Sequence, residues 1–285
     1  MKENYLTQEN LEAFIQAAFK EDVGEGDHST LAAIPRGQTG RAQLLIKEDG
    51  IIAGLELAVK IFHSFDRDLE VELLMEDGQQ VKAGDVGLTV AGSAASILTT
   101  ERLVLNCMQR MSGIATKTHE FTQLISHTKA KLLDTRKTTP NFRMLEKWAV
   151  AIGGGVNHRF ALYDMVMLKD NHIDFAGGIK AAVESTQHYL SEKLLQLKIE
   201  VETRNLQEVE EALAVGGVDI IMLDNMDYPT MKKAVKMIGS KAITEASGGI
   251  TEATLKDVAE CGVDFISVGA LTHHVKSMDI SLKAY

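Results

Sequence analysis

The fold is indicated by two stretches that share one pattern, IEVETRNLQEVEEALAVGGVDIIML (residues 199–223) and ITEASGGITEATLKDVAECGVDFISV (residues 243–268). Each stretch begins with a strand-like run, continues through a segment with helical spacing, and returns through Gly-Val-Asp to a second strand-like run. The two helical segments are residues 206–215 and 251–260. Strands that alternate with helices indicate a parallel sheet, and repeated units of this size favour a β/α barrel.

The same alternation extends from this pair back to about residue 113. Short apolar runs lie between amphipathic stretches, at KLLD (131–134), MVMLK (165–169), KIEVE (198–202), DIIML (219–223), KAITEAS (241–247) and DFISVG (264–269). We therefore predict an α/β fold in which residues 113–273 form the β/α barrel. Functional side chains are expected where its strands end, because barrel enzymes carry their sites at the carboxyl ends of the strands.

Residues 1–112 have a different pattern, which predicts a smaller α+β domain. Apolar runs at 43–47 and 51–54 flank a Glu-Asp-Gly turn, which is a hairpin signal. The polar stretch 21–35 is expected to be a loop. Helices are predicted at residues 7–20, 55–65 and 96–111, and residues 274–285 are expected to pack back on this domain.

Composition limits the class of protein. The 285 residues carry a net charge of −10, with 45% hydrophobic and 25% charged residues, which is typical of a folded chain. An acidic chain is a poor candidate for binding nucleic acid or an anionic membrane surface. Residues 102–172, however, hold 11 Lys and Arg against 5 Asp and Glu, a local charge of +6 against −16 elsewhere. A small anionic substrate is therefore compatible with the composition.

The compartment is expected to be the cytoplasm. Cys107 and Cys261 form no CxxC motif, so the sequence predicts no disulfide framework and no zinc site. The first residues lack the basic and apolar regions of a signal peptide, and no apolar run approaches membrane-spanning length.

Three strings place cations after or near predicted strands. Arg136 and Lys137 follow a strand in DTRKTTP (134–140), where they face a ligand unless the string is only a solvated loop. His158 and Arg159 end GGGVNHR (153–159), whose glycines permit close backbone approach. Lys169 ends MVMLK, and its type alone leaves a Schiff-base lysine, a carboxylate clamp and a plain surface residue open.

Acids and glycine turns follow the later strands. Alternation places Glu200 and Glu202 on one face, and Glu202 pairs naturally with Asp224 of the next strand. Two such carboxylates can flank Mg²⁺, although strand-end acids also cap helices. Ser247-Gly248-Gly249 and Gly269-Ala270 form strand–glycine turns of the kind that bind phosphate through backbone N–H groups, or that merely make tight connections.

Taken together, these strings resemble the quinolinate phosphoribosyltransferase family. DTRKTTP, GGGVNHR, LYDMVMLKDNHI, IEVE, IIMLDN, EASGGI and SVGALTH occur in that family's order, and the similarity runs from about Glu21 to the end of the chain. The resemblance implies that quinolinate and phosphoribosyl pyrophosphate give nicotinate mononucleotide, pyrophosphate and CO₂, with Mg²⁺, in NAD biosynthesis. It also implies an open β/α barrel joined to an N-terminal α/β sandwich, in a homodimer with shared active sites, with larger assemblies left open.

The resemblance also implies roles for individual residues. Quinolinate would be held by Arg136, Lys137, His158, Arg159 and Lys169, with Arg102 reaching in from the partner subunit. Glu202 and Asp224 would serve Mg²⁺ and the ribose–pyrophosphate, and with Lys137 and Lys169 they make up the implied catalytic set. The 5′-phosphate would be bound by Ser247, Gly248, Gly249, Gly269 and Ala270.

Two positions depart from the family pattern, and three other classes of protein share part of it. Asn141 and Ala161 stand where glycine is expected; Asn tolerates the left-handed conformation, and Ala adds one methyl group. A related phosphoribosyltransferase associated with molybdate transport usually lacks the Lys169–His172 segment. A barrel aldolase using Lys169 would leave the other cations unexplained, and a non-catalytic binder of phosphorylated metabolites would leave the complete cation set without a use.

Overall fold

The computed structural model describes residues 5–285. The chain divides into two compact units. The antiparallel unit contains the described residues up to 119 together with 138–154 and 271–285, and the parallel unit contains 120–137 and 155–270. Among residues 5–285, no helix combines the length and the hydropathy needed to cross a membrane.

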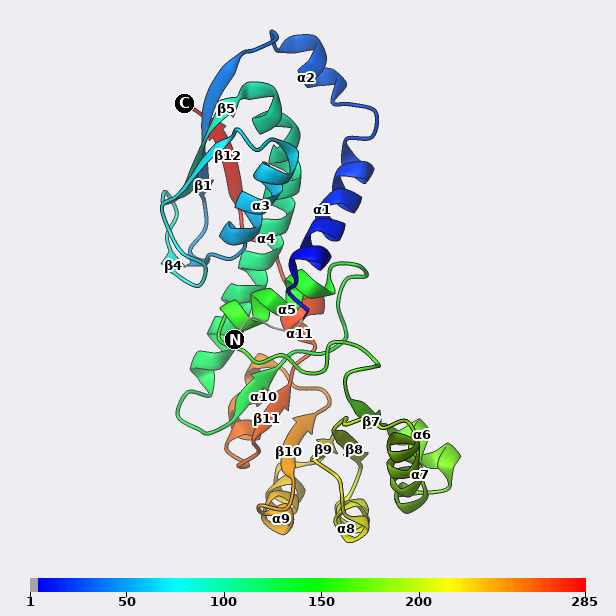
Figure 1. Cartoon of the computed structure of the whole chain (residues 1–285). Coiled ribbons are helices and arrows are strands. Elements are labelled where there is room, and N and C mark those ends of the chain that lie inside the picture. Colours follow the sequence, from blue (N-terminus) through cyan, green and yellow to red (C-terminus); the bar gives the residue numbers. More distant parts are fainter. Residues whose placement is uncertain (1–4) are drawn as a thin grey trace. The chain divides into compact units, whose positions relative to one another are not determined.

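The parallel unit is built on six parallel strands (Figure 1). Their order across the sheet is β6 (Lys131–Leu133), β11 (Phe265–Ser267), β10 (Ile243–Ser247), β9 (Ile220–Asp224), β8 (Ile199–Thr203) and β7 (Val166–Leu168). β6 and β7 are the two edges, so the sheet is open. The strands are connected through helices α6 (Asp170–Ala176), α7 (Ile179–Glu192), α8 (Leu206–Val215), α9 (Tyr228–Ile238) and α10 (Glu252–Ala259). The predicted α/β class and all six predicted strands are confirmed.

The Gly-Val-Asp triplets have the same structural role in both repeats. Asp219 accepts a hydrogen bond from the backbone N–H of Ile199 at 2.8 Å, and Asp264 accepts one from that of Thr244 at 2.9 Å. Each carboxylate therefore binds the backbone of the preceding strand, 20 residues earlier. These contacts lie at the start of two parallel strand pairs, β8 with β9 and β10 with β11, whose registers pair Glu200 with Ile220 and Glu245 with Phe265.

The antiparallel unit holds a four-stranded sheet of order β12 (Ile280–Ala284), β1 (Thr39–Ile46), β5 (Val86–Ser93) and β3 (Glu70–Leu73). The C-terminal strand thus pairs with β1, as Figure 1 shows by the red arrow beside the blue strand. β2 (Gly50–Ile51) pairs with β4 (Gln80–Val81). The predicted hairpin across Asp49-Gly50 is therefore wrong, because both edges of β1 are occupied by β5 and β12.

The helices of this unit agree with the sequence in part. α1 (Gln8–Asp22) and α3 (Leu55–Phe65) are confirmed, and α4 (Ala94–Leu124) is longer than predicted because Ile114, Ala115 and Phe121 continue its buried face. The loop predicted at 21–35 is wrong in part: α2 (His28–Ala33) forms there, capped by the Asp27 carboxylate, which accepts from Thr30 N–H. The remaining helices are α5 (Arg143–Ile152) and α11 (Ala270–His273).

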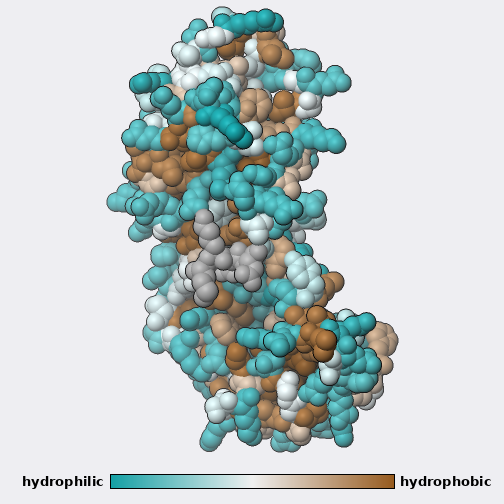
Figure 2. All heavy atoms as spheres, in the orientation of Figure 1, coloured by the Kyte–Doolittle hydropathy of each residue, from teal (hydrophilic) through white to brown (hydrophobic). Residues whose placement is uncertain are grey.

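The surface is predominantly hydrophilic with scattered apolar side chains. Figure 2 shows teal residues over most of the drawn face, interrupted by brown areas. Phe175 and Leu194 are the most exposed large apolar side chains among the described residues, at 91% and 90%. This distribution agrees with a chain in which a quarter of the residues are charged.

A buried ion pair holds the antiparallel unit together around α5. The fully buried Glu146 accepts from Nε and Nη2 of Arg110, at 3.0 and 2.8 Å, and from the N–H and hydroxyl of Thr139. Arg110 also donates to the backbone oxygens of Thr272 and Val275. One pair therefore ties α4, α5, the segment after Lys137 and the C-terminal segment to one another.

Removing one partner of this pair should destabilise the chain strongly. Arg110→Met leaves the Glu146 carboxylate buried without its cation, and we expect the free energy of unfolding to fall by about 3 kcal/mol. Urea unfolding followed by the fluorescence of Trp148, the single tryptophan, measures this change. The matched control is Lys180→Met, which removes the exposed Lys180–Glu184 pair and should cost less than about 1 kcal/mol. Equal losses in the two variants would contradict the role assigned to Arg110.

Candidate active site

The predicted site residues of the parallel unit gather at one edge of its sheet. Glu202, Asp224 and Ser247 lie at or near the ends of β8, β9 and β10. The others follow a strand or precede the next one: Arg136 and Lys137 after β6, His158 and Arg159 before β7, Lys169 after β7, and Gly248, Gly249, Gly269 and Ala270 after β10 and β11. Because the strands are parallel, the positions that follow a strand lie toward the carboxyl edge, and His158 and Arg159 are brought there by contacts with Asp134 and Arg136 after β6. Arg102 lies in α4, in the antiparallel unit.

The loop that carries His158 and Arg159 is attached to the end of β6. The fully buried Asp134 accepts from the backbone N–H of His158 at 2.9 Å and from the Asn157 amide at 2.6 Å. Val156 N–H donates to the backbone oxygen of Leu132 at 2.8 Å. The backbone of His158 is thus held in place by the end of β6, the strand that precedes Arg136 and Lys137.

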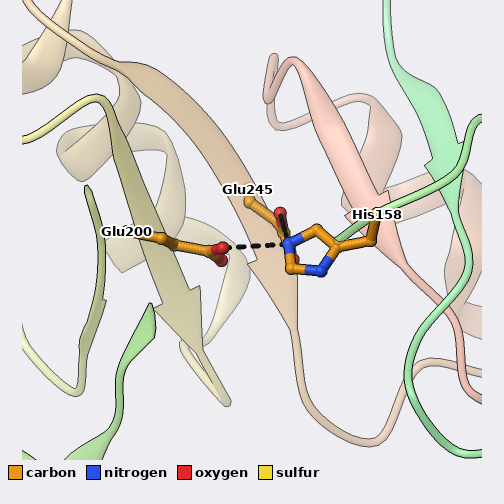
Figure 3. Close-up of side chains that lie close together, drawn as sticks. All are labelled: His158, Glu200 and Glu245. Atoms are coloured by element: carbon orange, nitrogen blue, oxygen red, sulfur yellow. Dashed lines mark hydrogen bonds and ion pairs between the residues drawn. The ribbon is translucent and has the colours of Figure 1, made fainter. Parts of the chain in front are cut away.

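The His158 ring points toward two buried glutamates, as Figure 3 shows. Nε2 lies 2.9 Å from Oε2 of Glu200 in β8 and 3.5 Å from Oε2 of Glu245 in β10. Both glutamates are fully buried, and the imidazole side chain is 7% exposed. The hydroxyl of Ser267 in β11 donates to Oε1 of Glu245. Two strands therefore contact a single imidazole, and a third strand contacts it indirectly through Glu245.

Burial raises the pKa values of both glutamates. The pKa of Glu200 rises to about 8, although the nearby Arg159 cation opposes the change. The pKa of Glu245 rises to about 7, through burial and then through the charge of Glu200. At neutral pH the pair consequently retains protons, which limits the negative charge beneath the site.

Arg159 and Arg136 lie near one another. Burial lowers the pKa of Arg159, and the adjacent cation of Arg136 lowers it further, while Glu200 and Asp164 oppose both effects. Arg159 also donates to the backbone oxygen of Met165 at 3.2 Å. Two guanidinium groups that repel one another in a half-buried setting are stabilised by an anion with two negative groups.

Glu202 and Asp224 form a second acidic pair. Burial raises the pKa of Glu202, the negative charge of Asp224 raises it further, and the Lys169 cation opposes both. Asp224 also accepts from the Asn225 amide at 2.7 Å. The mutual repulsion of the two carboxylates would be relieved by a divalent cation, and oxygen ligands are those that Mg²⁺ prefers, so these residues fit the ion.

The turn after β10 requires glycine. Gly248 has a φ of +95°, and a Cβ built there would lie 2.3 Å from Oδ1 of Asn225. Asn225 N–H donates to the backbone oxygen of Ser247 at 2.9 Å. The backbone after β10 is therefore packed directly against the end of β9, and a side chain at residue 248 would separate the two.

Sequence reasoning missed four residues of this arrangement: Asp134, Glu200, Glu245 and Ser267. For the three acids the signal is a carboxyl group within or at the end of a run that otherwise reads as a buried strand, since such a group needs a specific partner; Ser267 carries no such signal. The two residues that stand where glycine is expected are both accommodated by the backbone. Asn141 has a φ of 61°, so it does adopt the left-handed conformation, and Ala161 lies in a turn where Asp164 accepts from its N–H at 2.8 Å.

Comparison with known proteins identifies similar sequences over the whole chain. Residues 27–112 match the family model described as quinolinate phosphoribosyl transferase, N-terminal domain, and residues 114–283 match that of the C-terminal domain. A chloroplastic nicotinate-nucleotide pyrophosphorylase [carboxylating] of Arabidopsis thaliana is 47% identical over 289 residues, covering 96% of this chain and 82% of the relative. A probable enzyme of the same name from Synechocystis sp. is 44% identical over 276 residues, covering 96% and 92%.

Solved structures agree with these matches. NadC from Streptococcus pyogenes superposes with a TM-score of 0.92 at 39% identity, covering 98% of this chain and 97% of its own. The nicotinate-nucleotide pyrophosphorylase from Francisella tularensis gives 0.91 at 38% identity, covering 99% and 98%. The fold described above is thus that of experimentally determined relatives.

The raised pKa of Glu245 predicts a pH-dependent stability. A carboxyl group whose pKa rises on folding contributes stability that is complete below the unfolded value of 4.5 and is lost as the pH rises through about 7. Glu245→Gln removes the ionisation, so its free energy of unfolding should fall less than that of the wild type between pH 5 and pH 8. The expected difference is on the order of 2 kcal/mol.

Urea unfolding at a series of pH values measures this difference. The control is Glu210→Gln on the exposed face of α8, which should follow the wild-type profile. If Glu245→Gln also followed that profile, the carboxyl group would not carry the proton assigned to it.

Proposed function

The chain belongs to the quinolinate phosphoribosyltransferase family, and from this premise we propose how its residues carry out that family's reaction. The chain transfers the phosphoribosyl group of phosphoribosyl pyrophosphate to quinolinate with decarboxylation. The products are nicotinate mononucleotide, pyrophosphate and CO₂, in the biosynthesis of NAD. The parallel unit holds all but one of the residues that we assign to this chemistry.

The proximity of Arg136 and Arg159 is the observation that carries the substrate assignment. Quinolinate has two adjacent carboxylates, and two neighbouring guanidinium groups match such a dianion. Lys137, His158 and Lys169 complete the proposed pocket. Lys169 interacts electrostatically with both Glu200 and Glu202, so it stands between the cationic and the acidic parts of the site.

The acidic pair and the glycine turns are proposed to hold phosphoribosyl pyrophosphate. Glu202 and Asp224 would hold Mg²⁺, which stabilises the charge of the departing pyrophosphate when it is bound. The same carboxylates suit the ribose hydroxyls and the positive charge that develops on the sugar. Backbone N–H groups after β10 and β11 would bind the 5′-phosphate, at residues Ser247, Gly248, Gly249, Gly269 and Ala270.

The catalytic contribution is proposed to be orientation and charge, without a covalent enzyme intermediate. The cations hold the pyridine ring against the sugar, and the ring nitrogen becomes positively charged as the new bond forms. That positive charge stabilises the electron pair left on the adjacent ring carbon when the carboxylate leaves as CO₂, and a proton from solvent then bonds to that carbon. A Lys169 adduct trapped by borohydride in the presence of substrate would contradict this scheme and favour an aldolase-like mechanism.

We also propose that the chain works in the cytoplasm as a homodimer in which Arg102 completes the partner's site, with larger assemblies left open. Cys107 and Cys261 are both buried and form no disulfide with one another, as suits a reducing compartment. The chain's acidic charge does not favour binding to nucleic acid or to a membrane.

Purified protein should release CO₂ from quinolinate when phosphoribosyl pyrophosphate and Mg²⁺ are present. Nicotinate should not replace quinolinate, and removal of Mg²⁺ by a chelator should stop turnover. Arg136→Ala should reduce turnover at least about 100-fold, because a charge-assisted bidentate contact is lost. Arg204→Ala, which removes an exposed cation bound to Glu208 and Asp174, is the matched control and should stay active. Turnover of nicotinate in place of quinolinate would reject the assignment.

Mixing two inactive variants tests the shared site. Arg102→Ala and Lys169→Ala should each be inactive alone, and a mixture should recover about a quarter of wild-type activity, since half of the random dimers then contain one intact site of two. Activity is measured in the mixture and in tagged, purified heterodimers, which should have about half of wild-type activity. Heterodimers that form without any recovered activity would place Arg102 outside the partner's site.

A further inference from the structure

Beneath the proposed substrate-binding set, and joined to it through His158, the parallel unit contains a buried polar cluster whose members come from four different segments. Glu200 and Glu245 contact the His158 ring from β8 and β10, and Ser267 contacts Glu245 from β11. The two glutamates are completely buried, and burial of a carboxyl group is energetically unfavourable unless it has a specific partner. In this cluster that partner is the imidazole.

We propose that Glu245 is a positioning residue for the quinolinate pocket. It holds the His158 imidazole, together with Glu200, in the orientation that the dicarboxylate substrate requires, and Ser267 holds Glu245 in turn. This inference rests on the proposed function, because it assumes that His158 contacts quinolinate. It assigns to Glu245 and Ser267 a role in the affinity for quinolinate and none in the affinity for phosphoribosyl pyrophosphate.

The geometry separates the two ways in which His158 is held. Asp134 fixes the backbone of His158, through the N–H at 2.9 Å, and the glutamates fix the ring through Nε2. A ring held only by its backbone can rotate about its side-chain bonds, and each lost rotamer state costs binding energy when substrate arrives. Holding the ring before substrate binds therefore strengthens the binding of quinolinate.

His158, Glu200 and Glu245 also carry the donor types of a metal site. The three donor atoms lie within 4.8 Å of one another, which is compatible with an ion among them. However, Nε2 already lies at hydrogen-bonding distance from Glu200, and the other oxygen of Glu245 accepts from Ser267. Oε1 of Glu200 and Oε2 of Glu245 have no hydrogen-bond partner within residues 5–285, and Oε2 of Glu245 meets the ring only at the 3.5 Å of an ion pair, so a bound metal ion is one outcome of the test.

The test replaces Glu245 and measures the KM of each substrate. Glu245→Leu keeps most of the volume and removes both contacts, so the KM for quinolinate should rise about tenfold while that for phosphoribosyl pyrophosphate stays within about twofold. In Glu245→Gln the amide oxygen can still face the ring and the amide N–H₂ group can donate to the hydroxyl of Ser267. The KM of this variant for quinolinate should therefore stay within about threefold of wild type. Ser267→Ala should raise the same KM about threefold, and it serves if the leucine variant does not fold.

Thr244→Val is the matched control. Thr244 is also buried in β10 and hydrogen-bonded, but its partner is Asp264 and not the cluster. Its loss should lower stability and leave the ratio of the two KM values unchanged. In a His158→Ala background, Glu245→Leu should change the KM for quinolinate by less than about twofold, because the residue through which it acts is gone.

Four results would overturn the inference. They are an unchanged KM for quinolinate in folded Glu245→Leu or Ser267→Ala, an equal rise in both KM values, the same pattern in Thr244→Val, and a full Glu245→Leu effect without His158. Metal analysis of the purified wild type adds a fifth: one equivalent of a transition metal that is lost in Glu245→Leu would make the cluster a metal site. Wild-type protein that does not turn over quinolinate would reject the proposed function itself, whereas active wild type with unaffected variants rejects only the inference.

Discussion

Three carboxyl groups are buried at the carboxyl edge of the parallel sheet, and the surrounding site is organised by the need to compensate them. Asp134, Glu200 and Glu245 have no exposed surface, and an isolated carboxylate in such a position is strongly unfavourable. Asp134 is satisfied by the backbone and amide groups around His158, whereas the two glutamates are compensated in part, by the His158 ring, Ser267 and retained protons, and keep one oxygen each without a hydrogen-bond partner among the described residues. The position of His158 is consequently determined from both ends, by its backbone and by its ring.

The same compensation explains how an acidic chain can bind an acidic substrate. Four carboxyl groups, those of Glu200, Glu202, Glu245 and Asp224, lie near the proposed pocket, and if all were ionised they would oppose a dianion. The raised pKa values of Glu200 and Glu245 remove part of that charge, and a divalent cation would offset Glu202 and Asp224. The cations of Arg136, Arg159 and Lys169 can then act on the substrate, although the chain as a whole carries −10.

The sequence predicted the parallel unit well, because the signals for each of its strands and helices lie within or beside that element. A buried parallel strand such as β9 is a continuous apolar run, and α8 agrees with its predicted bounds because its cap, Asn205, and its apolar spacing are all local. The hairpin at Asp49-Gly50 failed because strand partners are chosen by the whole sheet, and β12 comes from the far end of the chain. The buried cluster was missed for the same reason: an acid in a strand shows that a partner is needed, but only the fold brings His158 to Glu200 and Glu245.

The open sheet explains why the cations come from its two edge strands. A closed barrel would pair β6 with β7, whereas here the segment from Val156 to Met165 runs between them. Val156 is bonded to β6 through Leu132, and Arg159 donates to the backbone of Met165, just before β7. The segment that carries His158 and Arg159 therefore spans the open side, and Arg136 and Lys169 follow the strands at its two ends. The central strands carry the acids and the glycine turns, so the order of strands separates the residues proposed to bind the dicarboxylate from those proposed to bind the phosphorylated sugar.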